Sequence, residues 1–279
     1  MPYRRQILQA LLGVAAIPLA RPAQAADFPS RLMTMVVPYP AGGPSDFIAR
    51  QIQPELSRLL GQQMIVENIG GVGGALGIQK AIAAPHAGHT LTMASPMELV
   101  LAPLGLSAVR FKPEDMRLVA LLVNTTMVML VRKDMPTGSA DELVAQQKKP
   151  GARELGYGSV GPGSLYHLVA EKFSQQTGVK MLHVPYKGAA PLVTDLMGGQ
   201  IDLVFMPLSG PVPGLIKEGK VKALGIAARA PHPLFPQVPL LAGTKGLEDF
   251  EFDLSAGLQV PRGTPEAAVE ALRSEEHTS

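Results

Sequence analysis

A short apolar strand that breaks into a glycine-rich loop and then enters an amphipathic helix recurs along this chain. The first copy has its strand at 35–37, its loop at 38–44 and a helix that begins near Ser45 or Asp46. Glycine lets the backbone approach a ligand where a Cβ would collide, and a helix start offers unpaired N–H groups at the positive end of its dipole. One such loop is also compatible with an ordinary turn, but its recurrence favours a binding site for a small anion.

The repeated unit predicts the fold class. In chain order we expect strand 35–37 with helix 46–60, strand 64–67 with helix 75–84, strand 91–94 with a short helix, strand 154–157 with helix 164–176, strand 181–184 with helix 190–197, and strands 201–205 and 221–227. This alternation predicts an α/β fold with mainly parallel sheets, whose ligands lie at the carboxyl ends of the strands. Two consecutive β-rich runs, 118–123 and 127–132, interrupt it, so we place a domain crossing there. Pro54 predicts a kink or a break in the first helix.

Residues 1–25 have the pattern of a cleaved signal peptide. Arg4 and Arg5 precede an apolar run at 7–20, and Ala23-Gln24-Ala25 supplies a small-residue cleavage site. We therefore expect export to the periplasm. The paired arginines also resemble a twin-arginine signal, which leaves the choice between Sec and Tat export open. Because the apolar run is short, we do not expect the chain to span a membrane.

The basic character of the chain belongs to this leader. Removing Arg4, Arg5 and Arg21 lowers the number of Lys and Arg from 25 to 22, against 23 Asp and Glu, which gives a formal charge of −1. A nucleic acid or an anionic membrane is therefore not an expected partner. The sequence contains no Cys, which excludes disulfides, thiolate metal sites and a cysteine nucleophile.

Residues 273–279 are expected to be a non-native tail. They match the in-frame translation of a common sequencing-adapter oligonucleotide, and they interrupt a helix that has barely begun after Pro265. We therefore expect the native C-terminus to be missing from this sequence.

The loop at 158–163 and the helix start after it form a second candidate anion site. Ser159 and Ser164 offer hydroxyls, and the N–H groups of residues 163–165 open a helix. An enzymatic alternative makes Ser164 a nucleophile and His167 its base. Because Ser164 does not stand in a Gly-x-Ser-x-Gly elbow, helix capping and ligand contact are favoured.

The sequence carries no motif for a cofactor or a metal. The glycines at 70–77 miss the dinucleotide spacing because position 76 is Leu, and there is no Walker A motif. The other histidines lack the spacing of a metal site: His86, His89, His183 and His232. We take Asp46 as the N-cap of the first helix and Asp202 as a brace at a strand end. Accordingly, we expect neither a cofactor nor a metal.

Several short motifs occur together in an order that is more specific than any one of them. They are 37–43 with Asp46, 66–68 with Gly73 and Gly74, 157–159 with Gly163 and His167, 183–188, and 199–202. From Phe28 to about Leu272 the chain thereby resembles the Bug-type extracytoplasmic solute receptors, the TctC-like binding proteins of tripartite tricarboxylate transport systems. It departs from the usual pattern at 69–70, 86–89 and 206–207.

The resemblance implies a type II periplasmic-binding-protein fold with two α/β lobes around a ligand cleft. We assign residues 27–122 and 227–272 to lobe 1 and residues 123–226 to lobe 2. The resemblance also implies a small carboxylate-bearing solute and the membrane subunits of a transporter as partners. We expect a monomeric receptor that is not an enzyme. Two alternatives stay open: a ligand sensor for a two-component system, and a secreted hydrolase that uses Ser164 and His167.

Loops of both lobes are expected to contact the solute. The backbone N–H groups of residues 39–43 and 161–164, aided by the Ser159 hydroxyl, would bind carboxylate oxygens. Neutral donors without a fixed cation favour carboxylates over phosphates. In the family, the loop that contains Met206 faces the cleft. The expected ligand-binding residues are Tyr39, Pro40, Ala41, Gly42, Gly43, Asp46, Ser95, Ser159, Gly161, Gly163, Ser164, His167 and Met206.

Overall fold

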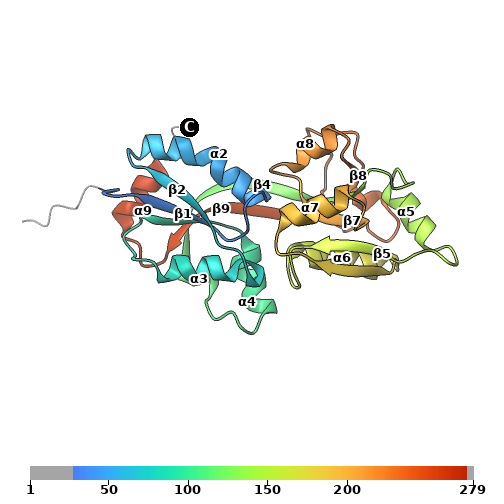
Figure 1. Ribbon diagram of the computed structural model, residues 1–279, viewed down its shortest axis with the longest axis horizontal. Helices are drawn as coiled ribbons and strands as arrows, with labels where there is room; N and C mark the ends of the chain where they lie inside the picture. The colour runs from blue at the N-terminus through green and yellow to red at the C-terminus, as the bar shows by residue number, and fades with distance from the viewer. Residues whose placement is uncertain (1–27, 275–279) are drawn as a thin grey trace, which may run out of the picture.

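The computed structural model describes residues 28–274, which form two α/β bodies joined by long strands (Figure 1). The predicted signal peptide at 1–25 and residues 275–279 of the predicted tail lie outside the described residues. Within the described part of the chain, no helix is long and apolar enough to cross a membrane.

The first body, on the left of Figure 1, is built on a sheet with the strand order β2-β1-β3-β9-β4. Its strands are β1 (Met33–Val37), β2 (Met64–Asn68), β3 (Thr90–Ala94), β9 (Asp253–Pro261) and the first part of β4 (Met116–Arg132). Its helices are α2 (Pro44–Leu59), α3 (Ala75–Ala83), α4 (Ala102–Gly105) and α9 (Glu266–Ser274), with the short turns η1 (Val72–Gly74), η2 (Met97–Leu101) and η3 (Pro113–Asp115). β1 pairs in parallel with β2 and β3, whereas β9 is antiparallel to β3 and β4.

The second body continues from the last part of β4. Its other strands are β5 (Leu155–Ser159), β6 (Met181–Pro185), β7 (Leu203–Pro207) and β8 (Val221–Ile226). Its helices are α5 (Ala140–Gln147), α6 (Leu165–Thr177), α7 (Ala189–Met197) and α8 (Val212–Lys217), with the turn η4 (Leu241–Gly243). β5 pairs in parallel with β6 and β7, and β4 pairs antiparallel with β7 and β8.

β4 carries the chain from one body to the other. It is one strand of 17 residues, whereas the sequence predicted two separate runs. Thr126 pairs with Asp253 of β9, and the next residue, Met127, pairs with Pro207 of β7. A single strand is possible here because the partner changes while the chain stays extended.

The segment 227–252 packs on the core of the second body. The ring of Phe250 lies 5.9 Å from that of Phe205 and 6.2 Å from that of Phe173, measured between centroids. These rings belong to the same buried cluster. We therefore propose that lobe 2 comprises residues 127–252 and that the rest of the described chain forms lobe 1. The return crossing then lies later than the position 227 predicted from the sequence.

α2 continues through Pro54 as one helix, so of the predicted kink or break the break is wrong. Proline inside a helix costs about 3 kcal/mol because it removes a hydrogen bond and crowds the preceding turn. Ile48, Ile52 and Leu56 lie at helical spacing and pack on the core of lobe 1. Full burial of a side chain of this size contributes about 1.5–3 kcal/mol, so these three partly buried side chains together still offset the cost of the proline.

Candidate functional site

Three neighbouring pockets lie between the lobes, and Tyr39, which follows β1, lines all of them. We call them the central pocket, the side pocket and the outer cleft. The central pocket contains about 560 Å³ of space not filled by atoms, including its part open to solvent, and the outer cleft about 1440 Å³. The loops singled out by the sequence meet here, since Gly43 and Val160 line the central pocket and Tyr39 and Gly163 line the side pocket.

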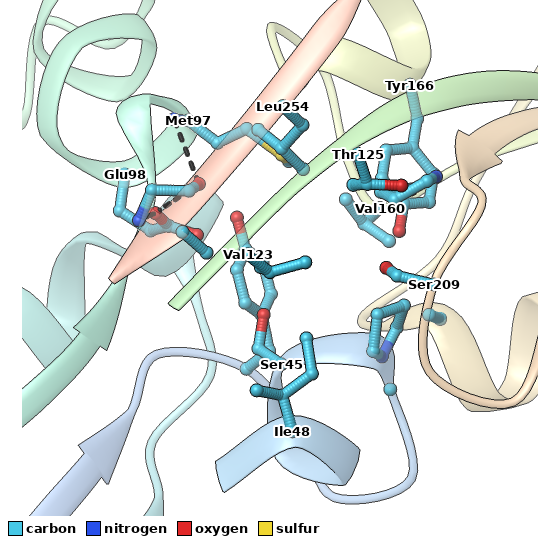
Figure 2. Close-up of a pocket in the computed structure, with 17 residues that line it drawn as sticks. Ser45, Ile48, Met97, Glu98, Val123, Thr125, Val160, Tyr166, Ser209 and Leu254 are labelled. Carbon is cyan, nitrogen blue, oxygen red and sulfur yellow. Dashed lines mark hydrogen bonds between the residues drawn. The ribbon is translucent and has the colours of Figure 1, made fainter. Parts of the chain in front are cut away.

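Both lobes and both crossing strands form the wall of the central pocket (Figure 2). Its lining residues are Tyr39, Gly43, Pro44, Ser45, Ile48, Ser95, Met97, Glu98, Val123, Thr125, Val160, Tyr166, Ala189, Pro207, Ser209, Leu254 and Ala256. Among these described residues there is no Lys, Arg or His. The polar groups are one carboxyl and several hydroxyls, set in an otherwise apolar wall.

Two helices begin at this wall. Gly43 is the N-cap of α2 and Pro44 stands in its first turn, while α7 starts at Ala189 after Gly188. Within residues 28–274, the backbone N–H groups of Gly43 and Ser45 form no hydrogen bond. Unpaired N–H groups at the positive end of a helix dipole attract anions, so this part of the wall suits a carboxylate.

Asp46 stabilises the first loop and lines none of the three pockets. Its side chain is buried, accepting the Gly42 N–H at 2.9 Å and the Arg50 Nε–H at 3.0 Å. Burial by itself raises the pKa of Asp46, but hydrogen bonds from Arg50, Gly42 and Asn68 outweigh it and bring the pKa below its ordinary value. The predicted N-cap role is wrong because Gly43 occupies that position. The Gly42 N–H predicted to bind solute already has an acceptor.

The N–H groups of the second loop are likewise already paired with acceptors of the protein. The Gly161 N–H donates to Ser159 Oγ at 3.0 Å, and the Gly163 N–H donates to His167 Nδ1 at 3.2 Å. The Ser164 N–H donates to the carbonyl of Gly161 at 3.2 Å. The predicted binding of a carboxylate by these N–H groups therefore does not match the geometry, because each donor already has an acceptor in the loop or in the first turn of α6.

Ser164 and His167 do not form a nucleophile–base pair. Ser164 is the N-cap of α6, and its Oγ donates to the Gly161 carbonyl at 2.7 Å. The His167 ring accepts from Gly163 and lies 4.4 Å from the ring of His183. The hydrolase alternative thus lacks the hydrogen bond that activates a serine. Residues 28–274 also contain no group of three His, Asp or Glu side chains that could hold a metal.

Met206 does not face the central pocket. It is fully buried in β7 rather than in a loop, and it lines a separate pocket with Gly42 and Ala190. Successive side chains of a strand point to opposite faces, so its neighbour Pro207 lines the central pocket instead, followed by Ser209. The prediction that Met206 lies in a loop is therefore wrong, but the pocket that it lines is formed by both lobes, with Gly42 and Pro44 from lobe 1 and Ala190 and Leu215 from lobe 2.

The remaining predicted residues divide among the pockets. Tyr39, Gly43 and Ser95 line the central pocket, Pro40 and Gly161 line the outer cleft, and Gly163 and Ser164 line the side pocket. Ala41 is exposed and lines none of the three, and Ser159 and His167 lie outside their linings.

Glu98 is a pocket residue that the sequence reasoning missed. It is 1% exposed in the single turn η2, and its Oε2 accepts both the N–H and the Oγ–H of Ser95 at 2.7 Å. Burial raises the pKa of Glu98 above its ordinary value, although the hydrogen bonds from Ser95 act in the opposite direction. The spacing Ser95-x-x-Glu98, which is that of a capping box, was the available signal.

Gly74 provides the space for the side chain of Glu98. A Cβ at Gly74 would overlap Glu98 Cγ and lie 3.3 Å from Glu98 Cβ, and the backbone there has φ +90°. The second glycine loop therefore admits a side chain of the protein at this position, where the sequence suggested the approach of a ligand.

Two further hydroxyls of the pocket were also missed. Tyr166 is 4% exposed, and burial, followed by the nearby charge of Glu98, raises its pKa, so its hydroxyl stays protonated. Thr125 Oγ1 is buried and has no hydrogen-bond partner in the described part of the chain. No local motif marks them, because one stands on a helix and the other on a crossing strand.

Two α/β lobes joined by crossing strands, with a pocket between them lined by both, define a two-lobed solute-binding protein. The chain belongs to the family described as the tripartite tricarboxylate transporter family receptor, whose model matches residues 48–278. This confirms the resemblance to TctC-like receptors. The family consists of periplasmic solute receptors rather than enzymes.

Individual proteins agree with this assignment. Protein BugT of Bordetella pertussis is 33% identical over 268 residues, covering 92% of this chain and 79% of BugT. The structure of MatC from Rhodopseudomonas palustris with bound malate has a TM-score of 0.82 at 32% identity and covers 90% of this chain and 85% of MatC. The structure of the periplasmic binding protein BugD has a TM-score of 0.81 at 31% identity and covers 89% of this chain and 82% of BugD. The predicted fold class is thereby confirmed.

Proposed function

We propose that this protein is a periplasmic receptor that binds a small carboxylate-bearing solute in the central pocket and delivers it to a tripartite tricarboxylate-type membrane permease. The observation that carries the proposal is the start of α2 at a pocket whose described lining offers N–H groups and hydroxyls but no cation. Neutral donors at a helix start suit a single carboxylate.

The carboxylate donors differ from those expected from the sequence. The N–H groups of Gly43 and Ser45 have no acceptor among the described residues, whereas those of Gly42, Gly161 and Gly163 do. The solute carboxylate therefore belongs at the start of α2, with the hydroxyl of Ser209 available from lobe 2. Because both lobes line the pocket, their closure around a solute would add contacts and select for it.

The relatives support this solute class. MatC, similar over most of its length, holds malate, a carboxylate, in its structure. Carboxylate binding by this chain is the corresponding proposal, and the particular acid follows from its own pocket residues.

Calorimetry of the purified protein tests solute binding. We would titrate mono-, di- and tricarboxylates, aromatic acids and amino acids, each beside its neutral primary amide. At least one acid should bind, and its amide should bind about tenfold more weakly, since a hydrogen bond to a charged group is worth about 1.5–3 kcal/mol. Ser209→Ala should weaken binding, whereas Ser107→Ala, at an exposed position, should not. Binding of no acid, or equal binding of acid and amide, would refute the proposal.

Export and delivery need cellular tests. Fractionation should recover the protein from the periplasm, and deletion of its gene should abolish uptake of the labelled solute. If uptake persists while solute-dependent transcription is lost, the sensor alternative is correct.

A further inference from the structure

We infer that two glycines of lobe 2, Gly188 and Gly210, are positioning residues that allow the lobes to close over the central pocket. Neither glycine lines the central pocket, the side pocket or the outer cleft. Each lies instead against a proline of lobe 1. We call these two contacts, Pro40 with Gly188 and Pro44 with Gly210, the clasp. This inference rests on the proposed function and assigns residues that set affinity without touching the solute.

The first contact of the clasp leaves no space for a side chain. A Cβ at Gly188 would lie 3.0 Å from Pro40 Cγ and 3.1 Å from Pro40 Cδ. The same ring also packs tightly within lobe 1, since a Cβ at Gly70 would lie 2.6 Å from Pro40 Cδ. The ring therefore has little room to retreat into its own lobe. A side chain at position 188 would push the lobes apart.

The loop of lobe 1 that takes part in the clasp is anchored at both ends. Asn68, the last residue of β2, donates from Nδ2 to the carbonyl of Tyr39 at 3.0 Å. The Gly42 N–H donates to Oδ2 of Asp46, which belongs to α2, at 2.9 Å. Because the loop is tied to a strand and to a helix, an overlap at the clasp would move a whole lobe rather than the loop alone. Hinge motion of domains is the usual response of this kind.

The second contact is a close approach to the backbone of α2. A Cβ at Gly210 would lie 2.8 Å from Pro44 Cα and 3.3 Å from Pro44 Cβ. Pro44 stands in the first turn of α2, so its Cα cannot shift unless the helix start moves. Gly210 follows Ser209, which lines the central pocket from lobe 2. The contact thus holds the Ser209 side of lobe 2 close to the start of α2.

The clasp is continuous with the wall of the central pocket. A Cβ at Gly43 would lie 3.5 Å from Ala189 Cβ, which is ordinary van der Waals contact, and both residues line the pocket. Gly43 carries one of the N–H groups proposed to bind the carboxylate, and Ala189 directly follows Gly188 at the start of α7. Closure at the clasp therefore brings the lobe 2 wall up to the carboxylate site.

The closed fraction of the protein enters the affinity directly. When only the closed arrangement binds tightly, the apparent dissociation constant is the intrinsic constant divided by the fraction of closed molecules. A variant that closes in about one molecule in ten therefore binds about tenfold more weakly. The clasp should change the affinity for every solute, whereas the pocket residues decide which solute is preferred.

Small-angle X-ray scattering and calorimetry test the clasp. We would measure the radius of gyration with and without malate, succinate and benzoate, and titrate the same three acids. Gly188→Ala and Gly210→Ala should have a larger radius than the unmodified protein and bind the best of these acids at least about tenfold more weakly. Position 188 is extended, with φ 178°, so its alanine adds no backbone strain.

Two glycines of lobe 2 provide matched controls. Gly243, like Gly188, lies outside the positive-φ region, and Gly219 has φ +66° against +59° for Gly210. No heavy atom lies within 4 Å of a Cβ built at Gly243 or Gly219. Gly243→Ala and Gly219→Ala should therefore keep the radius and the affinity of the unmodified protein.

A second substitution separates the clasp from a general loss of structure. Pro40→Ala removes Cγ and Cδ, the two atoms nearest to the new Cβ in Gly188→Ala, so the double variant should regain the radius and the affinity. Clasp variants that match their controls in both measurements overturn the inference, and so does weak binding that Pro40→Ala does not restore. If none of the acids in the wider panel binds, the proposed function fails, and the radius of the free protein decides the inference.

Discussion

Gly74→Ala tests the packing that holds Glu98 in the central pocket. The added Cβ overlaps Glu98 Cγ, lies 3.3 Å from the carbonyl oxygen of Pro38, and stands on a backbone with φ +90°. A side chain in the left-handed region costs about 1–2 kcal/mol. Moving Glu98 away from its two hydrogen bonds with Ser95 costs about 1.5–3 kcal/mol more. We therefore expect the free energy of unfolding to fall by about 2.5–5 kcal/mol.

Gly61→Ala is the matched control. Gly61 also has positive φ, +63°, but no heavy atom lies within 4 Å of a Cβ built there. It should lose only the conformational part, about 1–2 kcal/mol. Urea unfolding followed by circular dichroism measures both variants, and the difference between them isolates the overlap with Glu98. Adding Glu98→Ala to Gly74→Ala should recover part of that difference, as in a double-mutant cycle.

Equal losses in Gly74→Ala and Gly61→Ala would refute this reasoning. Glu98 could then move without cost, and its hydrogen bonds with Ser95 would not hold it in place. A larger loss for Gly74→Ala that Glu98→Ala does not relieve would assign the overlap to the Pro38 carbonyl instead.

Other substitutions test the remaining contacts. Because the folded pKa of Asp46 lies below its ordinary 3.8, its charge adds stability above that pH, which is lost as pH falls through the folded pKa. Asp46→Asn should lower stability at neutral pH by about 1–3 kcal/mol and flatten the acid limb of urea unfolding measured across pH. Asp202→Asn should cost about 2 kcal/mol, since this buried carboxylate accepts hydrogen bonds from two arginines, whereas exposed Asp134→Asn should cost less than about 1 kcal/mol. Ser164→Ala should cost about 1 kcal/mol through loss of the α6 cap, measured by thermal unfolding. Thr125→Val should not destabilise the protein in urea but should weaken carboxylate binding by calorimetry, because its buried Oγ1 has no partner among the described residues.

Each of these predictions has a contrary outcome. An unchanged acid limb in Asp46→Asn would mean that its hydrogen bonds do not shift its titration. Equal losses of stability in Asp202→Asn and Asp134→Asn would show that burial does not strengthen the hydrogen bonds of Asp202. Ester hydrolysis by the unmodified protein that disappears in Ser164→Ala would restore the enzymatic alternative. A marked loss of stability in Thr125→Val would show that the hydroxyl has a structural role.

The repeated units made the fold predictable from sequence. Periodic apolar residues and glycine loops locate α2, α3 and α6 closely, because burial of one helix face and the turn before it are local properties. The position of Met206 was not predictable in this way. Whether the β7 strand ends before or after it depends on pairing with Val128 of β4, which is distant in the sequence.

Donors can be read from a sequence, but their acceptors cannot. The glycines of both loops supply N–H groups, yet Asp46 and His167 occupy the N–H groups of Gly42 and Gly163. Each of these acceptors follows its loop by a few residues on the next helix, so an Asp or His at that spacing is a usable warning. Glu98 was missed for a related reason, since its burial depends on Gly74, which lies in another loop.

The hydrogen-bonding groups that have no partner in the protein define the solute more closely than the residue types of the loops do. In the described chain, the Ser45 N–H and Thr125 Oγ1 lack partners, whereas the Glu98 carboxyl already accepts hydrogen bonds from Ser95 and Tyr39. An unpaired buried donor or acceptor costs about 1–3 kcal/mol, so a fold retains it where a bound molecule supplies the partner. The complement of these two groups is a molecule with acceptor oxygens, as a carboxylate has.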